Sequence, residues 1–150
     1  MILADFKAFP RVGRILGIDW GARRTGVAVS DASREFVFVR DAIVVRGAGG
    51  AIAQKVAEIA VAEQVSGIII GLPVHADGTP SQTATDVRNF AADLSALTDL
   101  PIAFIEENLT SHAAQEQMGR VRVADIKARL DSEAARVILE NAIAVISRMK

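Results

Sequence analysis

Carboxylate side chains that directly follow apolar runs are the residues of this sequence best suited to chemistry. Asp19 ends one short apolar run, and Glu106 and Glu107 end another. Charged side chains are rarely buried without a partner, so acids beside buried strands need an explanation. Ordinary explanations exist: Asp19 could form a turn by accepting hydrogen bonds from Gly21 and Ala22, and the glutamates could serve solubility. The other explanation for Asp19 is a metal ligand or a phosphate-site residue.

The positions of these acids favour a shared site. Sites in open α/β sheets form at the carboxyl ends of parallel strands, where Asp19 and the glutamate pair are both expected. Because side chains alternate across a strand, only one of Glu106 and Glu107 can share a face with Asp19. Asp131, in the first turn of the predicted last helix, could add a third acid or be the helix N-cap. Clustered carboxylates repel one another unless a hard cation such as Mg²⁺ or Mn²⁺ neutralises them.

The hydrophobic pattern predicts the elements that position these acids. Apolar runs predict five strands, at 15–19, 25–30, 35–45, 67–72 and 101–105, with Pro73 ending the fourth. Recurrence at three and four residues predicts helices at 51–64 and 81–97, a short one ending at 118, and a last one opening at Asp131. Residues 1–13 are predicted to be a loosely held arm, and the basic residues 119–130 a mobile loop.

The order of these elements predicts an α/β fold in one domain spanning residues 1–150. Three leading strands form a meander, and two β-α-β crossovers, assumed right-handed, add parallel neighbours. The result is a mixed five-stranded sheet with helices on both faces.

Charge is unevenly distributed although the formal net charge is only −1. Residues 1–46 carry eight Lys and Arg against five Asp and Glu, residues 47–118 carry two against nine, and residues 119–129 carry four against one. Two basic segments around an acidic middle could hold a polyanion around a metal-loaded centre, or could simply be solvated surface. Arg23 and Arg24, just after Asp19, and Arg120 and Arg122 are the candidate phosphate contacts.

Composition excludes several classes of site. The chain has no cysteine, so disulfides and thiolate zinc sites are excluded. No apolar run approaches the roughly 20 residues of a membrane span, and the first residues do not resemble a secretory signal. We therefore expect a cytoplasmic protein without membrane contact. His75 and His112 are isolated and fit structural or solvent-facing roles, although His75 could approach a substrate.

Four segments together resemble the signature segments of the YqgF/RuvX family. They are GIDWGARRTGVAVSD, GLPVHADGT, IEENLTS and LDSEAARVILENAI, and their order and spacing match from about Arg14 to Ile146. The resemblance implies a ribonuclease H-like fold related to Holliday-junction resolvases. It also implies a nuclease that matures the 5′ end of 16S ribosomal RNA, with metal-binding acids at Asp19, Glu107 and Asp131. Asn108 departs from the family, which usually has an arginine there that would contact a phosphate.

The implied chemistry suits these residues. Phosphodiester hydrolysis needs an activated water and neutralisation of transition-state charge, which divalent ions held by carboxylates can supply without a serine or histidine nucleophile. The substrate could be precursor 16S rRNA or a four-way DNA junction, and the protein a monomer or a homodimer. Two other classes fit less well. Actin-like sugar kinases and ATPases clamp nucleotide between two such domains, and a non-catalytic nucleic-acid-binding module would have no need of all three acids.

Overall fold

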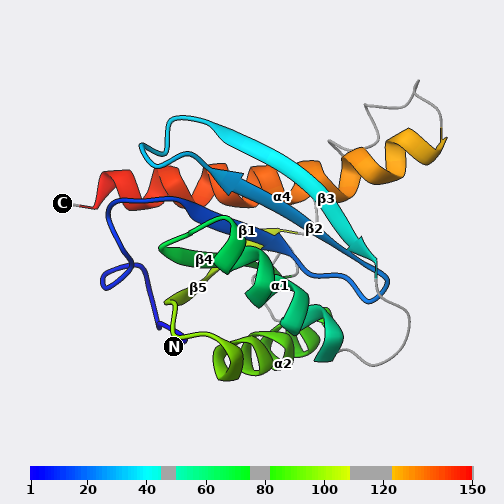
Figure 1. Ribbon diagram of the computed structural model, residues 1–150, viewed down its shortest axis with the longest axis horizontal. Helices are drawn as coiled ribbons and strands as arrows, with labels where there is room; N and C mark the ends of the chain where they lie inside the picture. Colours follow the sequence, from blue (N-terminus) through cyan, green and yellow to red (C-terminus); the bar gives the residue numbers. More distant parts are fainter. Residues whose placement is uncertain (45–49, 75–81, 109–122, 150) are drawn as a thin grey trace.

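The computed structural model describes residues 1–44, 50–74, 82–108 and 123–149, and at 50, 108 and 123–132 only the backbone. Five strands form one sheet in the order β3-β2-β1-β4-β5 (Figure 1). The strands are β1 (Ile15–Asp19), β2 (Arg24–Ser30), β3 (Val37–Val44), β4 (Gly67–Val74) and β5 (Ile102–Asn108). The described helices are α1 (Gly50–Ala62), α2 (Gln82–Leu97) and α4 (Val123–Arg148).

The pairing of the strands confirms the predicted mixed sheet. β1 is antiparallel to β2, which is antiparallel to β3, so the first three strands form a meander. β1 is parallel to β4, and β4 is parallel to β5. β4 therefore lies between β1 and β5, and the carboxyl ends of all three strands point to the same end of the sheet.

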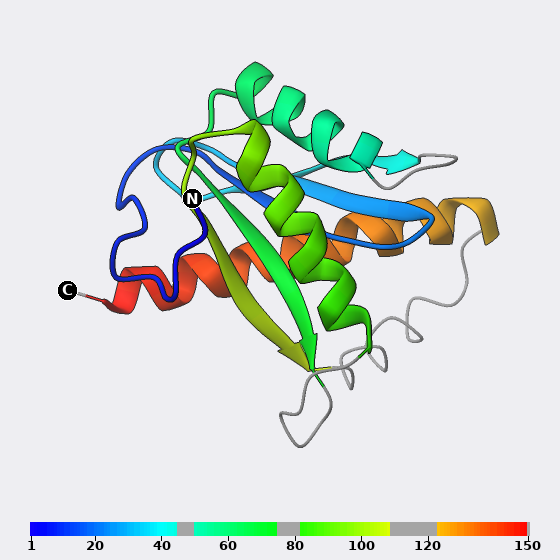
Figure 2. The same ribbon diagram turned by 90° about the horizontal axis from the view of Figure 1, so that it is seen from below.

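The helices lie on both faces of the sheet, as predicted. α1 and α2 cover one face and α4 runs across the other (Figures 1 and 2). Alternate residues of β1 separate accordingly: Leu16 and Ile18 are buried in the cluster that includes α1 and α2, whereas Ile15 is buried in the cluster that includes α4. Both faces of β1 are apolar because each is covered by a helix.

Glycine at position 17 allows α4 to approach β1 closely. A Cβ at Gly17 would lie 2.8 Å from Leu139 Cβ and 3.2 Å from the Ala135 carbonyl oxygen. Only a residue without a side chain fits between the strand and the helix backbone here. The middle of α4 is thereby fixed over β1.

The first residues of the chain are held against the sheet, so the prediction of a loosely held arm is wrong. Ile2 pairs with Ile102 at the start of β5, with Leu3 N donating to Ile102 O at 2.7 Å. Phe9 is 2% exposed and its ring fills the space above Gly67, where a Cβ would lie 2.5 Å from Phe9 Cζ. Phe9 is thus a buried aromatic anchor of this segment.

Two predicted boundaries are also wrong. β4 continues through Pro73 to Val74. Pro73 has no N–H to donate, but the pairing of β4 with β1 already ends at Ile70, so no hydrogen bond to β1 is lost at Pro73. α4 begins at Val123, not at Asp131, so the part of the predicted mobile loop from 123 to 130 is helical. Asp131 is therefore inside a helix and is not its N-cap.

The other elements agree with the sequence within a few residues. β3 has an irregularity where Thr25 pairs with Ile43 but Val27 pairs with Arg40. Among the described helices, none is long and apolar enough to cross a membrane.

Candidate functional site

Asp19 and Glu107 lie at the same end of the sheet. Asp19 is the last residue of β1, and Glu107 is the last but one of β5. Both strands are parallel to β4, which separates them. The expected convergence at a common strand end is therefore present for these two acids.

Alternation along β5 decides which glutamate shares a face with Asp19. Ala103 and Ile105 belong to the cluster with α4, so Glu107, next in that series, faces α4 as well. Glu106 follows Phe104 on the opposite face and is exposed. Asp19 follows Ile15 and Gly17, which face α4. Asp19 and Glu107 therefore share the α4 face, and Glu106 does not.

Glycines lie beside Asp19 on both neighbouring strands. Asp19 pairs with Gly26 of β2, and continuing the β1–β4 register past Ile18 and Ile70 brings Gly71 alongside it on the other strand. Neither glycine has a side chain to fill the face around the carboxylate. The sheet thus leaves room at this point for another group.

The carboxylate of Glu107 extends into the room above Gly71. A Cβ at Gly71 would lie 3.3 Å from Glu107 Oε2 and 2.4 Å from Ile138 Cδ1. Strands lie about 4.8 Å apart, so two acids separated by a whole strand meet only if one side chain crosses it. The Glu107 side chain reaches over Gly71 of β4, on the face that α4 covers, and so extends from β5 toward β1.

Burial raises the pKa of the Glu107 carboxyl, because removal from water disfavours its charged form. The side chain is half-buried rather than fully exposed like that of Glu106. A nearby cation would compensate for the lost solvation of the carboxylate. Within the described residues, no group of three or more His, Asp or Glu side chains forms a ready metal cluster.

The third predicted acid lies on the part of α4 whose side chains are outside the described residues. Asp131 is one helical turn before Ala135, whose carbonyl oxygen lies beside Gly17. Arg11, which precedes β1, donates to Met149 O at the other end of the helix. α4 therefore runs against the direction of β1, and its first half lies toward the end that carries Asp19 (Figure 1).

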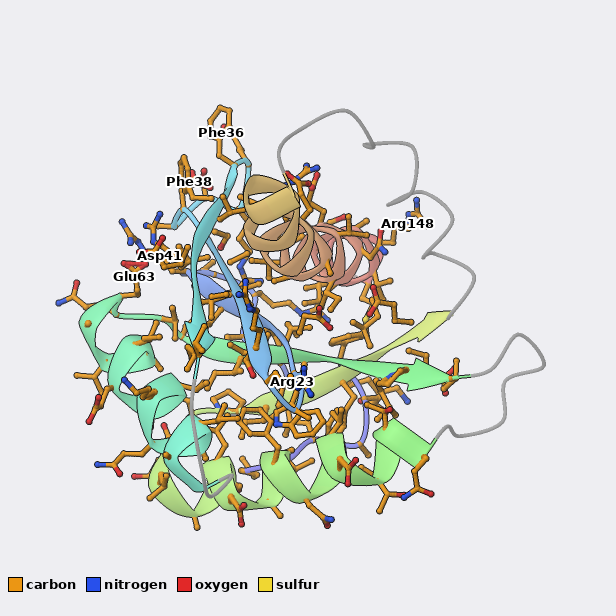
Figure 3. The ribbon with its side chains drawn as sticks, turned by 90° about the vertical axis from the view of Figure 1, so that its right-hand side faces the viewer. Arg23, Phe36, Phe38, Asp41, Glu63 and Arg148 are labelled. Atoms are coloured by element: carbon orange, nitrogen blue, oxygen red, sulfur yellow. The ribbon has the colours of Figure 1, made fainter. Side chains whose placement is uncertain are left out.

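The turn between β1 and β2 presents two arginines at the same end of the molecule. Arg23 and Arg24 are exposed, and Figure 3 looks onto this end with Arg23 near the centre of the view. The turn is tight: a Cβ at Gly21 would lie 2.3 Å from Arg24 O. Thr25, fully buried, has its Oγ1 3.5 Å from Gly21 N and from Gly21 O. The arginines therefore project from a restrained turn.

The remaining predicted residues lie outside the described parts. They are His75, His112, Arg120, Arg122 and the side chain of Asn108. Sequence reasoning missed Gly71 and Ile138, which shape the space beside Glu107. The signal available for Gly71 was a glycine interrupting the apolar run of β4.

A comparison with protein families shows to which family this chain belongs. The family model for RuvX, described as a Holliday junction resolvase, matches residues 13–144. The chain belongs to the RuvX family. A relative from Maridesulfovibrio salexigens, named "Putative pre-16S rRNA nuclease", is 39% identical over 133 residues, which are 87% of this chain and 98% of the relative. One of the same name from Rhodobacter capsulatus is 37% identical over 145 residues, 93% and 89% of the two chains.

A solved structure shows the fold of this RuvX-family chain independently. T. thermophilus RuvC, in complex with a Holliday junction substrate, matches with a TM-score of 0.54 over 90% of this chain and 96% of that one. The identity is 13%, so the likeness concerns the fold, which is ribonuclease H-like. The expected fold class is confirmed.

Proposed function

We propose that this chain is a nuclease that hydrolyses phosphodiester bonds with a divalent cation, Mg²⁺ or Mn²⁺. The observation that carries the proposal is the placement of Asp19 and Glu107 on one face at parallel strand ends, with Glu107 Oε2 above Gly71. The relatives' name supports precursor 16S rRNA as the substrate. The cleavage we propose matures the 5′ end of that RNA. Such a substrate would place the protein in the cytoplasm. The protein would act there as a monomer or a homodimer.

The residues fit a hard divalent cation. Mg²⁺ and Mn²⁺ prefer carboxylate oxygens, and Asp19 and Glu107 offer them on one face at the same end of the sheet. Desolvation, which raises the pKa of Glu107, is relieved when a cation lies nearby. Asp131 is the proposed third ligand, because α4 runs toward this end of the sheet. When bound, the cation would activate a water and neutralise charge on the scissile phosphate.

The other residues are proposed to hold the substrate. Arg23 and Arg24 project from the restrained β1–β2 turn beside Asp19, where they would bind backbone phosphates without reading sequence. Arg120 and Arg122 are proposed to extend this contact along the backbone. The chain would thereby orient a phosphodiester between the arginines and the acids.

Neighbouring glutamates provide a matched test of the site. Glu107→Gln and Asp19→Asn should each lower cleavage of precursor 16S RNA in Mg²⁺ by about a hundredfold or more, because each removes a charged ligand. Glu106→Gln, one residue away on the opposite face, should change cleavage little. Circular dichroism and thermal unfolding would establish that all three variants fold. Full activity of folded Asp19→Asn or Glu107→Gln would refute the proposed site.

A second substrate is favoured by the family description, which names a Holliday junction resolvase. The same variants should therefore be assayed on four-way DNA junctions in Mg²⁺ and in Mn²⁺. Cleavage of RNA alone would support the rRNA function, and cleavage of junctions alone would replace it with DNA resolution. Cleavage of neither substrate by wild-type protein would contradict the nuclease proposal itself.

A further inference from the structure

A cavity of about 430 Å³ lies at the end of the molecule opposite to Asp19. The N-terminal segment, the β2–β3 connection and the C-terminal end of α4 meet there, at the left in Figure 1. Its polar lining is contributed by Arg11, Ser33, Arg34 and Ser147. We call this cavity the arginine pocket. Its volume falls within the range of about 300–1,000 Å³ that is typical of small-molecule sites.

Arg34 has more donors than its structural role uses. Its Nε donates to Gly13 O at 2.8 Å and its Nη2 to Val12 O at 3.1 Å, which fixes the segment before β1. Its Nη1 is buried and has no hydrogen-bond partner within the described part of the chain. A buried guanidinium N–H without an acceptor is unfavourable, so this group favours an acceptor from outside the protein. Burial also lowers the pKa of Arg34, as expected for an incompletely compensated charge.

The backbone of Arg34 closes a turn in which its N–H donates to Asp31 O. Its φ is +62°, in the left-handed region that glycine and asparagine adopt more easily. Such a conformation is maintained where the surrounding contacts fix it, here the turn hydrogen bond to Asp31 O and the side-chain contacts to Gly13 O and Val12 O. The two carbonyl contacts account for Nε and Nη2 but leave Nη1 unexplained.

Arg11 adds a second cation to the pocket, and no acid among the described residues forms an ion pair with either arginine. Arg11 Nη1 donates to Met149 O, which leaves its other N–H groups for a ligand. Glu35, the residue after Arg34, is exposed and does not line the pocket. Asp31, three residues before Arg34, accepts hydrogen bonds from Ser33 Oγ and Phe36 N. The lining of the pocket is therefore cationic.

The rest of the lining is apolar. Ile143, Ile146 and Met149 of the α4 end form one wall of the pocket. A lining that combines cationic and apolar side chains suits a ligand with an anionic group joined to a flat or apolar body. Arginine forks bind phosphate oxygens with two parallel hydrogen bonds, which makes phosphate the best-matched anion.

We propose that the arginine pocket binds the phosphate of a nucleotide, with Arg11 and Arg34 on the phosphate and the wall of Ile143, Ile146 and Met149 against the sugar or base. The phosphate can belong to a free mononucleotide or to the 5′ end of an RNA chain. Both sources present the same chemistry, and the experiment below separates them. This site is distinct from the strand ends that carry Asp19 and Glu107.

Calorimetric titration of the full chain in chelator tests the pocket without cleavage. The probes are inorganic phosphate, adenosine 5′-monophosphate, and a short RNA with either a 5′-phosphate or a 5′-hydroxyl. Wild-type protein should bind the nucleotide saturably, and Arg11→Ala should weaken binding by about tenfold or more, the effect of one charge-assisted contact. Arg14→Ala, an exposed cation outside the pocket, is the matched control and should change affinity less than about twofold.

Two further variants test nucleotide binding by the pocket if Arg11→Ala does not fold. Arg34→Lys retains the charge but loses the fork, and Ser147→Glu brings a carboxylate to the rim of the pocket. Both should weaken nucleotide binding while thermal unfolding remains cooperative. Binding of the free nucleotide would identify a small-molecule site, whereas binding only of 5′-phosphorylated RNA would identify an RNA-end site.

The proposal is overturned if wild-type protein binds neither the nucleotide nor the 5′-phosphorylated RNA, or if Arg14→Ala loses as much affinity as Arg11→Ala. Because all titrations contain chelator, this failure would leave the nuclease proposal standing. The Asp19→Asn variant, in turn, should lose cleavage but bind the nucleotide as wild type does.

Discussion

The Glu107 carboxylate lies over Gly71 of the neighbouring strand, with Oε2 3.3 Å from the position of a Cβ at that glycine. An acid two strands away from Asp19 is brought toward it because the strand between them lacks a side chain at this point. The site therefore depends on a glycine as much as on its acids.

We expect Gly71→Ala to lower cleavage more than stability. The new Cβ would lie 2.4 Å from Ile138 Cδ1 and 2.9 Å from Ile138 Cγ1, and 3.3 Å from Glu107 Oε2. Overpacking of this kind costs about 1–3 kcal/mol, whereas displacement of the carboxylate removes a ligand. The measurements are thermal unfolding and cleavage at a temperature where the variant is folded. Adding Ile138→Val should recover stability but not cleavage; recovery of both would mean that Gly71 matters for packing alone.

The raised pKa of Glu107 predicts a pH dependence of the metal-free protein. A carboxyl whose folded pKa exceeds its ordinary 4.5 binds its proton more tightly in the folded state. Its stabilising effect is present below that value and is lost as pH rises through the folded pKa. We expect stability to fall over this interval in chelator, and Mg²⁺ to restore it by binding the folded form.

Glu107→Gln is the variant that isolates this effect. It should remove this fall of stability with pH and weaken the response to Mg²⁺, measured by thermal unfolding from about pH 4 to about pH 8. Glu106→Gln, on the opposite face, should leave the metal response as in wild type. A Glu107→Gln protein with unchanged pH dependence and metal response would exclude Glu107 as a ligand.

Arg23 should contribute to binding through phosphate contact alone. Each neutralised phosphate contributes about 0.7 to the slope of log affinity against log salt for a single strand, and about 0.9 for a duplex. Arg23→Ala should therefore flatten the slope by about that amount for every sequence tested, measured in chelator by fluorescence anisotropy. Arg14→Ala lies at the other end of β1 and should leave the slope of a substrate without a 5′-phosphate unchanged. Sequence-dependent losses in Arg23→Ala would instead indicate base contacts.

Phe9 should be a major anchor of the N-terminal segment. Its side chain is 2% exposed over Gly67, so Phe9→Ala should destabilise the protein by about 3–5 kcal/mol, the usual effect of removing a buried ring. Phe36, 62% exposed, is the matched control, and Phe36→Ala should cost less than about 0.5 kcal/mol. Denaturant unfolding measures both. Similar values for the two variants would mean that the segment is only loosely attached.

The sequence predicts that Asp19 shares a face of the sheet with one of two adjacent glutamates, but it does not predict which of the two. Both faces of β5 are apolar, because helices cover both, so hydrophobic alternation gives no indication of which face carries α4. The strand ends themselves were predictable, since apolar runs followed by acids mark them. To decide which glutamate faces α4, one must know which helix packs on which face of the sheet.

The first turns of α4 were missed for a different reason. Periodicity identifies a helix by the stripe that it buries, and the segment from Val123 to Leu130 belongs to the part of α4 that extends past the sheet in Figure 1. The sequence of this segment shows only weak apolar periodicity, so it does not predict a helix. Phe9 was missed because one buried ring in a short irregular segment has no period to detect.

The cluster beneath α4 joins the earliest and latest parts of the chain, with Phe9 and Ile15 packed in one core with Leu139 and Ile146. During synthesis, β1, β2 and β3 are made first, and their α4-facing side stays uncovered until the last helix emerges. Ribosomes add about 5–20 residues per second, so that apolar side is exposed for several seconds in every new molecule. Chaperones that bind nascent chains would find their site on this half of the sheet, and a chain interrupted before α4 would expose it permanently.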